Sequence, residues 1–376
     1  MKNYGLASID EFLNNFIVYR NLRPVDTRLP SLNELRSKIG LPAGQFPRKT
    51  QMPYAHAINH ILQAAREIEA PGTMITKVIC LGDTVMSDGS AFSNICHAGN
   101  KHGAAFIGSE NDAPLAVERI DTPGGFLYKA NRWGAVEEFN KTLQTQDLVI
   151  DSQTVILVDL DKTSLGARGR NDKIIDRIRL EAAYETLNDI LGPQFEPDLF
   201  EKAYSHFNQP EYHPFTTDNQ DYLVYLCLMV GSGLFSVTTL SEQISSGAIG
   251  DFGLFTQAIQ QRINELPEAL RKTHQDFYTQ YLIGDPTPFK TFRVNEYLNI
   301  RKYMGTQPNN APVELLLKDE VTITQEIRQI VHEWKNQGAL LFGLSDKPDE
   351  ASIPSPDLLA QGYLPIHQIK THAVGG

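Results

Sequence analysis

The sequence predicts an α/β protein with a Rossmann-like parallel sheet and an inserted all-helical domain. Three short apolar runs, at 78–81, 155–158 and 339–344, are each followed at once by polar residues. Runs of this length are typical of strands that are buried on both faces of a parallel sheet. Between 166 and 320 the strand signals give way to helical patterns. We therefore expect a sheet-containing core at 1–165 and 321–376, with a helical domain at 166–320.

Composition limits the possible functions. The chain has 376 residues, 41% of them hydrophobic, and a formal charge of −11 from 34 basic and 45 acidic residues. It contains no basic run of the kind that binds nucleic acid, and no apolar run reaches the roughly 18 residues of a membrane span. Three cysteines without CxxC spacing argue against a disulfide framework or a zinc site. Asp10 and Glu11 interrupt the segment where a signal peptide would need an apolar core, so we expect a soluble, cytoplasmic protein.

The first 150 residues are expected to form helices and strands in alternation. Ser31 is the predicted N-cap of the second helix, and no element is predicted for 110–132. The expected helices are at 8–22, 31–39, 53–69, 91–98 and 133–143, and the expected strands at 78–81 and 104–109.

The C-terminal part repeats the pattern of helix and strand. After the helical domain, in which 222–230 reads as a buried core helix, we expect a helix at 326–334 and a strand at 339–344. A helix at 356–361 and a strand within LPIHQIKTH, at 364–372, would close the chain.

Acidic residues follow two of the predicted strands. Asp159 and Asp161, with Thr163, come directly after 155–158, and Asp83 and Asp88 follow 78–81. Ligands of open parallel sheets bind beyond the carboxyl ends of the strands, so these carboxylates are expected to face a common crevice. Oxygen ligands of this kind suit Mg²⁺. Each aspartate can also be read as a turn or helix cap.

Two further polar residues accompany these acids. Ser345 ends the third buried strand, and Lys49 precedes the helix at 53–69. A cation is disfavoured at the start of a helix by the helix dipole, so Lys49 is expected to have an anionic partner. Arg48 and Lys347 are alternatives to Lys49 as the anion-binding cation, and Ser345 can also be read as a helix cap.

Together these segments resemble the motifs of the haloacid dehalogenase (HAD) superfamily. DLDKT at 159–163 is similar to the first motif, DxDxT, although the commoner form has Gly where Lys162 stands. LLFGLSD, ending at Ser345 and the residue after it, resembles the second motif, Lys49 the third, and GDTVMSD at 82–88 the fourth. The order along the chain is third, fourth, first, second, which one circular permutation restores. The family's C1-type cap would then be the insertion at 166–320, and the joint would lie within 110–153.

The resemblance implies a Mg²⁺-dependent phosphatase acting on a small phosphomonoester. In that case Asp159 would be the nucleophile that forms an aspartyl-phosphate, and Asp161 the general acid and base. The resemblance assigns the metal to Asp159, the backbone carbonyl of Asp161, Asp83 and Asp88. It assigns the substrate phosphate to Thr163, Ser345 and Lys49.

The substrate is not specified by the sequence, and neither is the oligomeric state. The second acid, Asp161, favours phosphate ester hydrolysis over carbon–halogen cleavage within the family. A HAD-like binding or regulatory module without turnover is the alternative function. Arg168 and Arg170, which follow the first motif, can contact substrate or face solvent.

Overall fold

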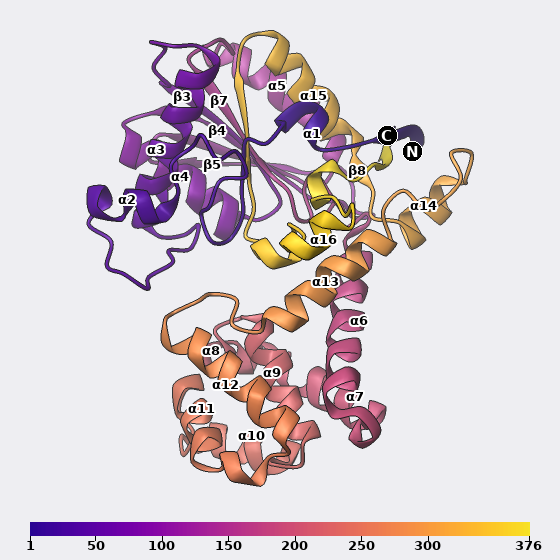
Figure 1. The fold of residues 1–376 in the computed structure, drawn as a ribbon. Coiled ribbons are helices and arrows are strands. Elements are labelled where there is room, and N and C mark those ends of the chain that lie inside the picture. Colours follow the sequence, from indigo (N-terminus) through magenta and orange to yellow (C-terminus); the bar gives the residue numbers. More distant parts are fainter. The chain divides into compact units, whose positions relative to one another are not determined.

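The computed structural model describes residues 1–376, which divide into two compact units (Figure 1). The α/β unit comprises Met1–Arg177 and Ile300–Gly376, and the helical unit comprises Ile178–Asn299. An inserted helical unit is therefore present. Residues 166–177 and 300–320, which the sequence places with the helices, belong to the α/β unit.

A seven-stranded sheet in the order β2-β9-β7-β3-β4-β6-β5 organises the α/β unit. All neighbouring strands are parallel except β5 and β6, which are antiparallel. This confirms the predicted α/β class with a mostly parallel sheet. The strands are β2 (Ile17–Val18), β3 (Lys77–Gly82), β4 (His102–Gly108), β5 (Val117–Thr122), β6 (Gly125–Ala130), β7 (Thr154–Asp159) and β9 (Leu340–Leu344).

Both faces of this sheet are buried, because the side chains of its central strands alternate between two layers of helices. Val155 and Leu157 point into the core that contains residues of α2 (Leu32–Ile39), α3 (Met52–Glu69) and α4 (Ser90–Gly99). On the other face, Phe106 of β4 packs against Phe139 of α5 (Val136–Thr145), which in turn contacts Trp334 of α15 (Gln325–Asn336). Near-continuous apolar strands are the pattern expected for this arrangement.

A second, three-stranded sheet has the order β1-β10-β8, formed by β1 (Lys2–Ala7), β10 (Thr371–Gly375) and β8 (Ile323–Thr324). Lys2 pairs with Gly375, so the first and last strands lie side by side (Figure 1). The strand predicted at 364–372 is therefore largely wrong. Ile366–Gln368 form a 3-10 turn after Pro365, and the strand begins only at Thr371, outside the larger sheet.

Most other predicted elements are confirmed, and two regions differ. The helix predicted at 8–22 is wrong: α1 spans only Asp10–Leu13, because Asn14 adopts φ 52° and breaks the helix before β2. Residues 110–132, for which no element was predicted, contain the β5-β6 hairpin at one edge of the sheet. Ser31 caps α2 in a capping box with Glu34, as the sequence predicts.

The helical unit has its own core. Its central helix is α9 (Gln220–Gly231), whose residues 223–230 are all buried, confirming the core helix predicted there. The Tyr225 ring stacks on Phe277 with a centroid distance of 3.8 Å. The other helices are α7 (Pro197–Phe207), α8 (His213–Thr216), α10 (Val237–Ser245), α11 (Phe252–Gln261) and α12 (Glu268–Leu282), with parts of α6 (Asp172–Leu191) and α13 (Lys290–Lys302).

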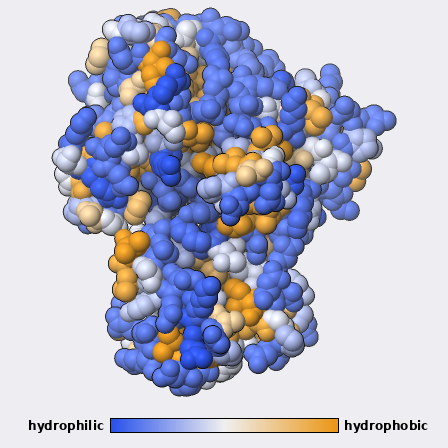
Figure 2. Space-filling model, in the orientation of Figure 1, coloured by the Kyte–Doolittle hydropathy of each residue, from blue (hydrophilic) through white to orange (hydrophobic).

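The remaining helices, α14 (Val313–Asp319) and α16 (Pro356–Ala360), belong to the α/β unit. On the face drawn in Figure 2, hydrophilic residues predominate and apolar residues form small separate groups. None of the helices combines the length and the apolar character that a membrane crossing requires.

Candidate active site

The carboxyl ends of β3, β7 and β9 lie next to one another. Val158 of β7 pairs with Leu81 of β3, and Asp159 pairs with Leu344 of β9. The residues that follow these positions are therefore brought to one edge of the sheet. This register explains why acids that are far apart in the sequence meet in the structure.

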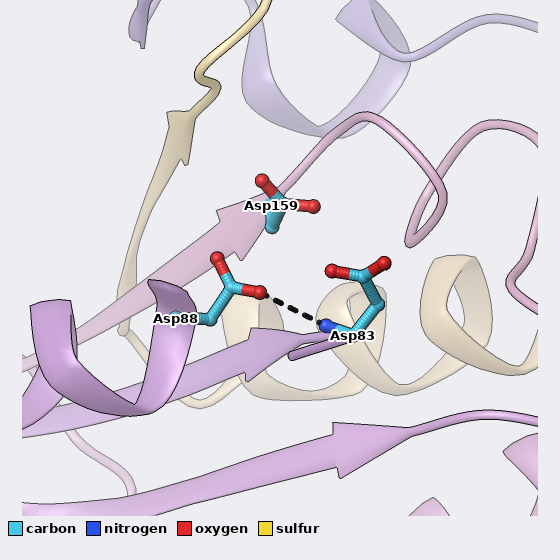
Figure 3. A group of neighbouring side chains, drawn as sticks. All are labelled: Asp83, Asp88 and Asp159. Carbon is cyan, nitrogen blue, oxygen red and sulfur yellow. Dashed lines mark hydrogen bonds between the residues drawn. The ribbon is translucent and has the colours of Figure 1, made fainter. Parts of the chain in front are cut away.

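Three aspartates converge at that edge (Figure 3). One carboxylate oxygen from each of Asp83, Asp88 and Asp159 lies within 4.8 Å of the other two. Asp88 and Asp159 are 3% and 6% exposed. Three carboxylates this close repel one another strongly unless cations or protons separate them.

Lys49 supplies one of these cations. Its Nζ donates to Asp159 Oδ1 at 2.7 Å, to Asp88 Oδ1 at 3.0 Å and to the carbonyl of Leu344 at 3.3 Å. All three ammonium protons thus have acceptors. Burial alone would lower the pKa of Lys49, but Asp159 and Asp88 outweigh it and hold that pKa well above its usual value. The anionic partner expected for Lys49 is therefore this group of aspartates.

Arg168 supplies a second cation from the loop that follows Asp159. Its Nε donates to Asp83 Oδ2 at 2.6 Å. Burial and the adjacent Asp88 nevertheless raise the pKa of Asp83 to about 7. We call the three aspartates together with Lys49 and Arg168 the aspartate cluster. Its formal charge is −1 when all three aspartates are ionised.

The other two aspartates differ in their surroundings. Burial raises the pKa of Asp159 well above the usual range although Lys49 opposes this. For Asp88 burial is outweighed by Lys49 and by the Thr84 amide, which together lower its pKa. Asp88 Oδ2 also accepts from the amides of Asp83 and Thr84, both at 3.1 Å. Asp88 is thus held on both oxygens, whereas Asp159 Oδ2 receives no hydrogen bond from the protein.

Gly82 makes room for this arrangement. A Cβ atom at position 82 would lie 2.4 Å from Asp88 Cβ and 2.6 Å from Asp88 Oδ2. The glycine that precedes Asp83 is therefore required by packing against Asp88.

The structure places the remaining predicted residues around this cluster in different ways. Ser345 is buried next to Leu344, and its Oγ accepts from the Lys347 amide at 3.1 Å. Thr163 is fully buried, and its hydroxyl has no hydrogen-bond partner. Asp161 is partly exposed, and its carboxylate is not part of the three-aspartate group, so the structure leaves only its predicted backbone carbonyl as a ligand.

Lys162 adopts an unusual backbone conformation for a residue with a side chain. Its φ is 63°, in the left-handed region that glycine adopts most easily. Its Nζ is 2.8 Å from Asp176 Oδ1 in α6. The Lys162 side chain is thus held by an ion pair in the same unit.

Two choices left open by the sequence become clearer. Among the three candidate cations, Lys49 is the one whose ammonium contacts the aspartates, while Arg48 is exposed. Arg168 contacts Asp83, and Arg170 instead joins Glu110 and Glu326 through ion pairs of 2.6 and 2.8 Å. No sequence pattern distinguishes these two arginines, because only the path of the loop decides which one reaches Asp83.

The donor set suits a hard divalent cation. All the side-chain donors are carboxylate oxygens, which Mg²⁺ prefers. A cation between Asp83 and Asp88 would also offset their mutual repulsion, which adds to the larger effect of burial in raising the pKa of Asp83. The residues present therefore fit Mg²⁺.

Comparison of the chain with models of protein families, with curated protein sequences and with solved structures found no match.

Proposed function

We propose that the protein is a Mg²⁺-dependent phosphatase of HAD type, which hydrolyses a small phosphomonoester through an aspartyl-phosphate at Asp159. The observation that carries the proposal is the position of Asp159. Its Oδ1 is held by Lys49, its Oδ2 has no hydrogen-bond partner, and Asp83 and Asp88 lie beside it. A carboxylate with one anchored and one available oxygen is suited to act as a nucleophile.

Each side chain around Asp159 has its own proposed role in phosphoryl transfer. Lys49 would orient Asp159 and offset the charge of the phosphoryl oxygens. Asp83, Asp88 and Asp159 would hold Mg²⁺, which when bound would neutralise the negative charge excess and polarise the phosphoryl group. Asp161, in the adjacent loop, is the proposed general acid for the leaving alcohol.

The roles proposed for Ser345 and Thr163 rest on their positions. Ser345 follows β9 directly beside Asp159 and is the proposed hydrogen-bond donor to the phosphoryl group. Thr163 is fully enclosed, so its hydroxyl would contribute by shaping the loop rather than by meeting solvent. Arg168 would position Asp83.

A circularly permuted HAD core is supported by the adjacency of the three motif-bearing strands β3, β7 and β9. The C-terminal strand does not extend this core, because β10 belongs to the smaller sheet. β2, which precedes Lys49 in the sequence and pairs with β9, is the better candidate for the strand ahead of the third motif. The helical unit is the proposed cap.

The alternative is a HAD-like binding or regulatory module without turnover. One feature favours it: Lys49 and Arg168 already contact all three aspartates, so the chain itself neutralises most of their charge. Mg²⁺ binding without hydrolysis of any member of a phosphate ester panel would favour this module.

Hydrolysis of phenyl phosphate tests the proposed function. We expect phosphate release that requires Mg²⁺, is lost with EDTA and is abolished by Asp159→Asn. The matched control is Asp176→Asn, which removes a carboxylate that pairs with Lys162 at the surface of the same unit. Full activity of Asp159→Asn would remove the proposal.

A further inference from the structure

Arg168 is the more weakly held of the two cations in the aspartate cluster. Its Nε donates to Asp83 Oδ2, and this is the only hydrogen bond of its guanidinium. Lys49, in contrast, donates to three acceptors. The Arg168 side chain is 38% exposed, whereas that of Lys49 is 4% exposed. Arg168 can therefore exchange its carboxylate for water, but Lys49 cannot do so without stranding a buried charge.

The backbone of Arg168 is fixed although its side chain is not. Its amide donates to the Lys162 carbonyl at 2.8 Å, and its carbonyl accepts from the Glu110 amide at 3.0 Å and from Trp133 Nε1 at 3.2 Å. Gly169 follows with φ 77°, and a Cβ atom there would lie 1.9 Å from the Glu110 carbonyl oxygen. The guanidinium is thus tethered beside the aspartates, and rotation of its side-chain torsions is enough to move it away.

Asp83 is the carboxylate for which Arg168 and a metal ion would compete. Asp88 and Asp159 share Lys49, whereas Arg168 is the only cation in contact with Asp83. Asp83 also completes the group of three carboxylates that fits a divalent cation. Two cations at one carboxylate repel each other, so the binding of one weakens the binding of the other.

We propose that Arg168 is an intramolecular competitor of the divalent cation: it neutralises Asp83 in the metal-free protein, and Mg²⁺ displaces it. This inference rests on the Mg²⁺ site of the proposed function but not on turnover. Burial would lower the pKa of Arg168, but Asp83 and, more weakly, Asp172 and Asp161 raise it. A guanidinium that leaves Asp83 therefore remains near two other carboxylates.

This competition would determine the Mg²⁺ concentration at which the site fills. The aspartate cluster carries a formal charge of −1 with both cations in contact, so a bound Mg²⁺ would raise it to +1. Displacement of Arg168 reduces the repulsion between like charges that this addition causes. When Mg²⁺ is scarce, Arg168 would instead keep the three carboxylates from repelling one another. Arg168 is thus a positioning residue that sets the affinity of the site for its cation.

Calorimetric titration with Mg²⁺ alone, without a phosphate ester, tests the competition. The titration is done at about pH 8.5, above the pKa of about 7 of Asp83, so that this carboxylate is ionised in the wild type. Arg168→Gln should bind Mg²⁺ about tenfold more tightly than the wild type, because the competing cation is gone. Arg168→Lys keeps a positive charge and should bind Mg²⁺ less tightly than Arg168→Gln.

The matched control is Arg119→Gln. Arg119 also pairs through Nε with an aspartate, Asp121 Oδ1 at 3.0 Å, but both side chains are exposed on the edge strand β5. This variant makes the same charge change away from the aspartate cluster, so its Mg²⁺ affinity should equal that of the wild type.

Modification by phenylglyoxal follows the displacement in the wild-type protein and does not depend on the folding of a variant. The reagent attacks guanidinium groups, and an ion-paired guanidinium reacts more slowly than a released one. Mg²⁺ should therefore speed the modification of Arg168 severalfold, as read by peptide mass spectrometry. The modification of Arg119 should not change.

Unchanged or weaker Mg²⁺ affinity in Arg168→Gln would overturn the proposal, because Arg168 would then support the metal site and not compete for it. Absence of Mg²⁺ binding in both proteins would do the same, as would modification of Arg168 that Mg²⁺ slows or leaves unchanged.

These outcomes are distinct from failure of the proposed function, which is read from turnover of phenyl phosphate. Competition without turnover refutes only the phosphatase. Mg²⁺-dependent turnover with an unchanged Mg²⁺ affinity in Arg168→Gln refutes only the competition.

Discussion

The α/β unit and the helical unit each contain a buried group of carboxylates paired with basic side chains, and the two groups have different roles. In the helical unit, Arg293 donates through Nε to Asp221 Oδ2 at 2.8 Å and through Nη1 to Glu296 Oε2 at 2.6 Å. The other oxygen of Asp221 accepts from the Phe289 amide. We call Asp221, Arg293 and Glu296 the arginine cluster.

The two clusters differ in whether a carboxylate oxygen is left without a hydrogen bond from the protein. Both oxygens of Asp221 are held by the protein, and the cluster joins α9 to α13 within the helical unit. In the aspartate cluster, three carboxylates share two cations, and Asp159 Oδ2 has no hydrogen-bond partner. An ion pair whose carboxylate oxygens are all hydrogen-bonded by the protein fixes packing. An ionic group with a free carboxylate oxygen and excess negative charge is instead suited to bind a ligand. Changes in the two clusters should therefore affect different properties.

The largest expected effect is on turnover. Asp159→Asn should lower kcat for phenyl phosphate by at least about a thousandfold, because the proposed nucleophile is lost. The thermal midpoint should change little, since Lys49 keeps Asp88 and the Leu344 carbonyl as acceptors. Steady-state kinetics and a thermal melt check the two parts. A large loss of stability with activity retained would reverse the roles assigned to the clusters.

The complementary change is Arg293→Met in the arginine cluster. Leaving the buried Asp221 carboxylate without its cation should cost about 3–5 kcal/mol of unfolding free energy, measured by urea denaturation, while Glu296 keeps Arg179 at 3.5 Å. Mg²⁺ affinity, measured by calorimetry, should not change. Adding Asp221→Leu should recover much of the stability, because an apolar side chain of similar volume needs no partner. If Mg²⁺ affinity fell together with stability, the separation of functions would be wrong.

Gly82→Ala tests the aspartate cluster by a change in packing that leaves every charged residue in place. The added methyl group would displace Asp88 and should cost about 1–3 kcal/mol. It should also remove the stabilisation by Mg²⁺ in a thermal melt, because Asp88 could no longer reach its partners. The matched control is Gly134→Ala, where a Cβ atom would meet nothing within 4 Å. A normal Mg²⁺ response in Gly82→Ala would show that Asp88 is not needed for binding.

The smallest expected effect concerns a third buried carboxylate, that of Glu320. It tests the direction in which pH changes the free energy of unfolding. Glu320 accepts from the amides of Gly305 and Gln307, both at 3.0 Å, and from His372. Burial would raise its pKa, but these hydrogen bonds outweigh it and lower the pKa below 4.5. The folded protein favours the ionised form of Glu320. The resulting stabilisation is therefore complete at pH values above the pKa of Glu320 in the unfolded chain, and it is lost as the pH falls through the lower pKa of Glu320 in the folded protein.

Glu320→Gln should therefore flatten the acid side of the stability profile. Urea midpoints at pH 7 and pH 4 should differ less in this variant than in the wild type. Glu314→Gln, at an exposed side chain in α14, is the control and should keep the wild-type profile. An unchanged difference between the two midpoints in Glu320→Gln would show that its hydrogen bonds do not favour the ionised form.

Features with a local physical cause could be predicted from the sequence. The apolar runs of β3, β7 and β9, the capping box at Ser31 and the core helix α9 each depend on neighbouring residues, and each is present. The convergence of Asp83, Asp88 and Asp159 also follows from strand ends meeting at one edge. Their closeness required only that the strands be parallel neighbours.

Features that depend on long-range contacts could not be predicted. β2 is only two residues long and is recognisable as a strand by its pairing with β9. The choice between Arg168 and Arg170 as the partner of Asp83 depends on a loop path, which contacts with Glu110 and Trp133 fix. Neither feature leaves a periodic signal in the sequence.

The most direct test of the central claim is chemical trapping of the intermediate. The protein with Mg²⁺ and phenyl phosphate would be quenched during turnover and treated with borohydride, which reduces an acyl phosphate to an alcohol. Peptide mass spectrometry should then find homoserine in place of Asp159, and Asp176→Asn should give the same product. Hydrolysis that continues with Asp159 unmodified, or with the modification on another residue, would contradict the account.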